Sequence, residues 1–199
     1  MTDDETALLD EERLLQAEAE EVAADLRLDE RLSALGDPVR VGAAALGVLV
    51  RRDLDVTVAC PRLDAAAHRA VADLGARLSR HPRVREVLIR DDTGAWNTDP
   101  AYPDGLYLGV RYRSPQGRDW TLDLWFVDEP ERQPDLAHLR ELGPALTPRL
   151  RAAVLAIKRA LLDRPGPGTP AGSHRVYRAV VEDGVRTPEE FDAWSARRR

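Results

Sequence analysis

The sequence of 199 residues predicts an α+β fold in which helices flank a mixed β-sheet. Segments with the alternating, valine- and leucine-rich pattern of strands recur in the middle of the chain, at 54–60, 85–90, 106–113 and 120–127. Apolar residues at helical spacing dominate both ends of the chain. The Ser-Pro-Gln-Gly-Arg segment at 114–118 has turn chemistry and predicts that the last two strands form an antiparallel hairpin.

The first of three expected regions, residues 1–35, is an acidic helical segment. Leu8, Leu15, Val22 and Leu26 are spaced by four or seven residues, which places them on one side of one or two helices. Residues 1–32 carry 12 acidic side chains against three arginines, so the rest of this surface is strongly negative. We expect the apolar stripe to dock onto the rest of the chain or onto a protein partner.

The sheet and one helix make up the second region, residues 36–130. It starts at the break Gly36-Asp37-Pro38, which precedes a short strand at 39–41. A helix is expected at 63–80, between the strands at 54–60 and 85–90.

Residues 131–199 form the third region, which we expect to be helical. Pro148 lies in the first turn of a helix predicted at 147–163, and the Pro- and Gly-rich residues 164–172 read as a linker. Thr187 and Glu190 have the spacing of a capping box at the start of the last helix.

The charge balance and the single cysteine limit the class of protein. The net charge is −6, but outside residues 1–32 the chain has a small basic excess, which is too weak and too mixed for a nucleic-acid-binding face. A long nucleic acid is therefore an unlikely partner.

Cys60 cannot form an internal disulfide and lies in an apolar run, as a small core residue would. Without an apolar run of about 20 residues or a basic leader, we expect no membrane partner and a cytoplasmic location.

Two carboxylates lie one residue apart at the start of a predicted strand. A glycine turn at Gly42-Ala43 follows the short strand at 39–41, and the next strand begins with Asp53-Leu54-Asp55. Because side chains alternate along a strand, Asp53 and Asp55 point to the same face. Two carboxylates so close repel each other unless a cation lies between them, and such oxygen ligands suit Mg²⁺.

A third carboxylate, Asp123, is the only charge in the apolar strand Thr121-Leu122-Asp123-Leu124-Trp125-Phe126-Val127. A lone charge is costly on a covered face and cheap where the face opens on a cleft with a metal. The alternative for Asp123 is a position on the solvated face of an edge strand. The alternative for Asp53 and Asp55 is a position at an exposed strand end.

These residues together resemble the polymerase-β-like nucleotidyltransferase superfamily. Its pattern is an apolar-Gly-Gly/Ser turn, then Asp-apolar-Asp/Glu, then a later carboxylate between apolar strand residues, and the resemblance covers about residues 38–128. It implies that Gly42 lets backbone N–H groups approach a triphosphate, that Asp53 and Asp55 hold the nucleotide-bound metal, and that Asp123 completes a second metal and activates an acceptor hydroxyl. Ala43 departs from the usual serine, so a hydroxyl donor to phosphate is absent.

Two basic residues are further candidates for nucleotide binding. Lys158 is the only lysine in an arginine-rich chain, which favours a position that needs a compact charge, such as a phosphate contact. Chance retention is the alternative. Arg52, beside Arg51, could neutralise phosphates or be an ordinary surface residue. The histidines His68, His81, His138 and His174 show no metal-ligand spacing, and we expect them at the surface or at helix ends.

The resemblance implies a nucleotidyltransferase that uses Mg²⁺ or Mn²⁺ and an NTP, with ATP as the first candidate. It would move an NMP group to a hydroxyl or amine of a small molecule or protein, because a basic face for nucleic acid is lacking. The alternative is a catalytically degenerate relative that senses nucleotide or binds a partner. Ala43 favours this alternative, and the three aspartates disfavour it.

Overall fold

The computed structural model describes residues 1–164 and 172–198. At its centre lies a sheet of five strands in the order β1-β2-β5-β4-β3. These strands are β1 (Asp37–Val41), β2 (Asp53–Ala59), β3 (Val84–Asp92), β4 (Gly105–Arg113) and β5 (Asp119–Val127). β2 and β5 are parallel and the other neighbours are antiparallel, so both the mixed sheet and the β4–β5 hairpin are confirmed.

One face of the sheet packs against helices α1 (Asp3–Asp25), α2 (Leu28–Ser33) and α4 (Ala65–Leu78). The alternate strand residues Leu54, Leu122 and Leu124 are fully buried in this core. Their neighbours in sequence, including the three aspartates, therefore point to the opposite face. Cys60 is buried in the same core, as expected.

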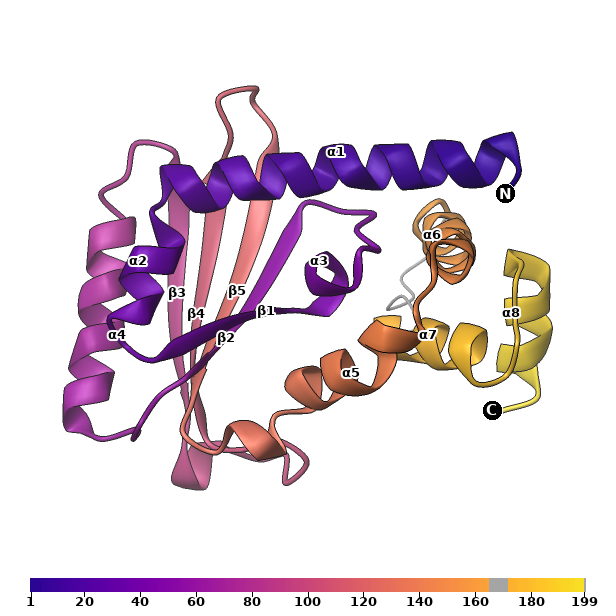
Figure 1. Cartoon of the computed structure of the whole chain (residues 1–199). Coiled ribbons are helices and arrows are strands. Elements are labelled where there is room, and N and C mark those ends of the chain that lie inside the picture. The colour runs from indigo at the N-terminus through magenta and orange to yellow at the C-terminus, as the bar shows by residue number, and fades with distance from the viewer. Residues whose placement is uncertain (165–171, 199) are drawn as a thin grey trace.

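The remaining helices lie beyond the β1–β2 side of the sheet, as Figure 1 shows. They are α3 (Gly42–Leu46), α5 (Pro134–Leu142), α6 (Pro148–Leu162), α7 (Ser173–Val181) and α8 (Pro188–Ala196). Their buried residues form a second hydrophobic cluster. The capping box of Thr187 and Glu190 is confirmed at the start of α8. Of the predicted linker 164–172, residues 165–171 lie outside the described part of the chain.

Helix α1 spans both clusters, since Val22 packs in the first and Leu9 in the second (Figure 1). It ends where Arg27 takes a left-handed conformation with φ 50°, so the N-terminal segment forms two helices. The apolar stripe thus docks onto the rest of the chain. Acidic side chains of α1 also form ion pairs with other elements: Glu20 with Arg40, Glu18 with Arg52 and Arg118, and Glu11 with Arg159. Among the described residues, no helix has the length and apolar character needed to cross a bilayer.

Candidate active site

Three aspartates converge on the face of the sheet that lies opposite α1, α2 and α4. In the parallel pair of β2 and β5, Asp55 is the register partner of Asp123, and Asp53 lies two residues before Asp55. One ligand atom from each of the three carboxylates lies within 4.8 Å of the others. Asp123 therefore lies on the strand adjacent to Asp53 and Asp55 and on the same face, as the roles implied by the resemblance require.

Burial and mutual repulsion make this cluster unfavourable in its charged form. Burial, followed by the charges of Asp53 and Asp123, raises the pKa of Asp55 to about 8. The pKa of Asp53 is also raised, chiefly by burial and then by Asp123. Asp53 Oδ1 is buried and has no hydrogen-bond partner. A divalent cation would supply both the missing partner and the missing charge, so these residues fit Mg²⁺ or Mn²⁺.

The glycine turn before the aspartates packs directly against them. Gly42 has φ +64°, and a Cβ atom at this position would collide with Asp55 Oδ2. Glycine is therefore required here both for the backbone conformation and for the space. Ala43, the next residue, lines the same pocket.

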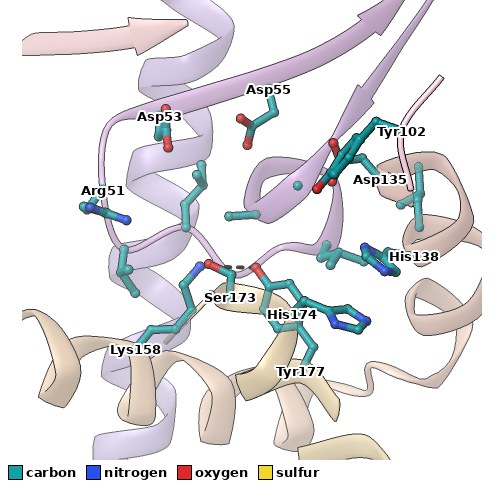
Figure 2. Close-up of a pocket in the computed structure, with 17 residues that line it drawn as sticks. Arg51, Asp53, Asp55, Tyr102, Asp135, His138, Lys158, Ser173, His174 and Tyr177 are labelled. Atoms are coloured by element: carbon teal, nitrogen blue, oxygen red, sulfur yellow. Dashed lines mark hydrogen bonds between the residues drawn. The ribbon is translucent and has the colours of Figure 1, made fainter. Parts of the chain in front are cut away.

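Asp53 and Asp55 line a pocket of about 340 Å³, a size that accommodates small ligands, and Asp123 lies next to Asp55 on the adjacent strand. One wall carries Gly42, Ala43, Asp53 and Asp55. The opposite wall comes from helices of the C-terminal region and includes Asp135, His138, Lys158, Ser173, His174 and Tyr177 (Figure 2). The pocket is thus built between the sheet and the C-terminal helices.

Lys158 lies in the wall of this pocket, where the side chain is only 8% exposed. Its Nζ donates hydrogen bonds to Val48 O at 2.9 Å and to Tyr177 Oη at 3.4 Å. Burial, and next the charge of Arg51, lower the pKa of Lys158 to about 8, although Asp55 and Asp53 oppose this shift. The ammonium therefore ties α6 to the loop before β2 and lies across the pocket from the aspartates. A phosphate contact stays a prediction.

Arg52 forms an ion pair with α1. Its Nε donates to Glu18 Oε2 at 2.8 Å, so this side chain anchors α1 to the loop before β2. The preceding residue, Arg51, lines the pocket described above, and both arginines line a second hollow that also includes Asp53. Phosphate contacts of Arg51 and Arg52 stay predictions.

Two features of the site could not be found from the sequence pattern. His138 on α5 and His174 in the first turn of α7 are both partly exposed, and they stack with their ring centroids 3.8 Å apart in the wall of the pocket. Tyr107 on β4 donates a hydrogen bond from its hydroxyl to Asp123 Oδ1. The pKa of Tyr107 is raised, mainly by burial and then by this hydrogen bond, so the hydroxyl stays a donor. Asp53, Asp55 and Asp123 form the metal-ligand cluster that the described residues offer, and it includes no histidine.

Comparison with known proteins gives structural matches only. No protein-family model and no curated protein sequence matches the chain. A solved structure of Cid1, described for its RNA terminal uridylyl transferase activity, matches with a TM-score of 0.54 and 18% identity, over 83% of this chain and 46% of Cid1. A cytoplasmic RNA terminal U-transferase matches with a TM-score of 0.50 and 16% identity, over 90% of this chain and 54% of its own.

The chain spans about half the length of these solved structures. At such identities the likeness concerns the fold alone. This chain has the fold of these solved RNA terminal uridylyl transferases over most of its length.

Proposed function

We propose that this protein is a metal-dependent nucleotidyltransferase, which moves an NMP group from an NTP, ATP being the first candidate, to a hydroxyl or amine and releases pyrophosphate. The observation that carries the proposal is the carboxylate trio of Asp53, Asp55 and Asp123, gathered from two strands onto one face of the sheet, where Asp53 and Asp55 line a pocket. Bound divalent ions would neutralise the phosphates and stabilise the charge that develops during transfer.

The residues of this chain have separate roles in the proposal. Asp53 and Asp55 would hold the ions that carry the triphosphate, and Asp123 would add a ligand to one of them and accept the proton of the acceptor hydroxyl. Backbone N–H groups at Gly42 and Ala43 would contact phosphate oxygens, as the resemblance implies. Lys158, across the pocket from Asp53 and Asp55, would supply positive charge to the triphosphate. Holding the reactants in line provides most of the catalysis.

The acceptor is proposed to be a small molecule or a protein. Arginines next to the site and along β4 are largely compensated, apart from Arg51 in the pocket wall, since Arg52 pairs with Glu18, Arg111 with Glu86 and Arg113 with Asp119. A polyanion therefore finds little net charge to bind. The proteins of the two matched structures are described as RNA terminal uridylyl transferases, so an RNA oligonucleotide belongs among the acceptors tested.

A second candidate is a degenerate relative that binds nucleotide without turnover. Ala43 is the observation that favours it, because the side-chain donor to phosphate is missing at the turn against Asp55. The intact trio is the observation against it.

An assay of NMP transfer distinguishes the active enzyme from the degenerate relative. Protein and each α-labelled NTP are incubated with Mg²⁺ or Mn²⁺ and with three acceptor sources: a small-molecule cell extract, a protein extract and an RNA oligonucleotide. Transfer of label by the wild type, lost in Asp123→Asn, supports the enzyme. Tight metal-dependent NTP binding without transfer to any acceptor supports the degenerate module.

A further inference from the structure

The ring of Tyr107 occupies space that is free only because residue 109 is a glycine. A Cβ atom at Gly109, two residues along β4, would be 2.6 Å from Tyr107 Oη and 3.0 Å from Cε1 and Cζ. The ring therefore lies along the strand above Gly109 and brings its hydroxyl to Asp123, which is the cross-strand partner of Gly109. The φ of Gly109 is outside the left-handed region, so the absence of a side chain, and not backbone freedom, is what this position provides.

Two further contacts restrain the same ring. The Arg90 guanidinium lies over it at 4.7 Å from the centroid, and Asp92 in turn holds this guanidinium through two hydrogen bonds of 3.0 and 2.8 Å. The ring of Trp125 packs beside it with a centroid distance of 5.1 Å. These contacts hold the ring so that its hydroxyl points at Asp123 Oδ1, to which it donates.

The geometry points to Tyr107 as a positioning residue for Asp123, with Gly109 as the residue that makes this position possible. Asp123 is the one member of the trio that β2 does not carry, so its orientation relative to Asp53 and Asp55 depends on its own side-chain torsions. The Tyr107 hydrogen bond occupies Oδ1, restrains those torsions and leaves the other oxygen for a metal ion. Partners of this kind, which orient a ligand without touching the metal, typically contribute about 10–100-fold to metal affinity. The inference rests on the proposed metal site and extends it.

Metal binding tests the inference without any need for an acceptor. Mn²⁺ is titrated into the full chain and free ion is measured by electron paramagnetic resonance, with thermal unfolding in EDTA as the check on folding. Tyr107→Phe removes only the hydroxyl, and Gly109→Ala displaces the ring. Each is expected to weaken the Mn²⁺ site that contains Asp123 by about tenfold or more. The double variant should be no weaker than the single ones, because both changes remove the same hydrogen bond.

Two variants on the opposite face of the sheet serve as matched controls. Tyr112→Phe also removes a hydroxyl–carboxylate hydrogen bond, of 2.6 Å to Asp25 Oδ2. Gly75→Ala on α4 also adds a methyl group that meets a side chain, Ile89 Cδ1 at 2.9 Å, away from Tyr107. Both should bind Mn²⁺ like the wild type.

Equal Mn²⁺ affinity in the wild type, Tyr107→Phe and Gly109→Ala would overturn the inference and leave the proposed function intact. Additive losses in the double variant would also overturn it, since the two residues would then act separately. A wild type that binds no Mn²⁺ would overturn the proposed function together with the inference.

Discussion

Replacement of Asp55 by asparagine is expected to stabilise the metal-free protein. The pKa of this carboxyl is raised from 3.8 to about 8 by burial and by the neighbouring charges of Asp53 and Asp123. At pH 7 the folded state therefore holds this carboxyl largely protonated while the unfolded chain ionises it, and this difference costs the folded state up to about 4 kcal/mol. Because three carboxylates share this repulsion, we expect one asparagine to recover roughly half of that cost, about 2 kcal/mol. In a chain of this size, this raises the melting temperature by about 4–8 °C.

The pH dependence of this effect has a definite sign. A folded-state pKa above the unfolded value stabilises the protein fully below pH 3.8, and this contribution is lost as the pH rises towards about 8. Asparagine has no such loss, so the advantage of Asp55→Asn should be small at pH 5 and large at pH 8. Thermal unfolding in EDTA at both pH values measures it, with Asp73→Asn on the exposed surface of α4 as the control. An Asp55→Asn variant no more stable than the wild type at pH 8, or equally stabilised at both pH values, would refute the reasoning.

Three other substitutions test the surroundings of the trio. Ala43→Ser should tighten NTP binding by about 1 kcal/mol, or roughly fivefold in calorimetric titration, because it restores one donor to phosphate; unchanged affinity would mean that the turn does not face phosphate. Lys158→Met should weaken NTP binding in the same assay and also lower stability by about 1–3 kcal/mol, since Val48 O loses its buried partner; normal NTP affinity would make Lys158 purely structural. Glu12→Ala should lower the free energy of unfolding by about 1–3 kcal/mol in urea titration, because this 4% exposed carboxylate accepts the Leu49 N–H; an unchanged midpoint would contradict this.

Local patterns in the sequence were sufficient to predict most of the strands of the sheet and the direction of their side chains. Alternation along β2 places Leu54 in the core and Asp53 and Asp55 on the other face, and the structure has this arrangement. The hairpin turn at 114–118 connects β4 and β5 as predicted. Such features depend on neighbours within a few residues, which is why pattern and turn chemistry reveal them.

Contacts between distant segments could not be predicted in this way. Nothing near His138 indicates that it stacks on His174, because the contact depends on how α5 and α7 pack. The same holds for Glu12, which reads as one acid among many on α1 but is buried against the loop before β2. Only the resemblance to a known fold linked Asp123 to Asp55, since they are cross-strand partners from opposite ends of the sheet region.

Arg51 and Arg52 are neighbours that the sequence could not distinguish. Arg51 and Arg52 have the same chemistry, and at the end of a loop neither alternation nor helical spacing tells which one faces the pocket. Glu18 on α1 holds Arg52 by an ion pair, and this contact between distant segments is not visible in the local sequence. A phosphate contact of Arg52 stays a prediction.

The most direct test of the central claim is a calorimetric titration of a non-hydrolysable ATP analogue into the wild type and Asp53→Asn, each with Mg²⁺ and with EDTA. Asp53 is the member of the trio with a buried oxygen that lacks a partner, so its loss should remove most of the ion binding. The account predicts binding by the wild type only with Mg²⁺, and little binding by the variant in either buffer. Equal affinity of the wild type with Mg²⁺ and with EDTA would contradict it.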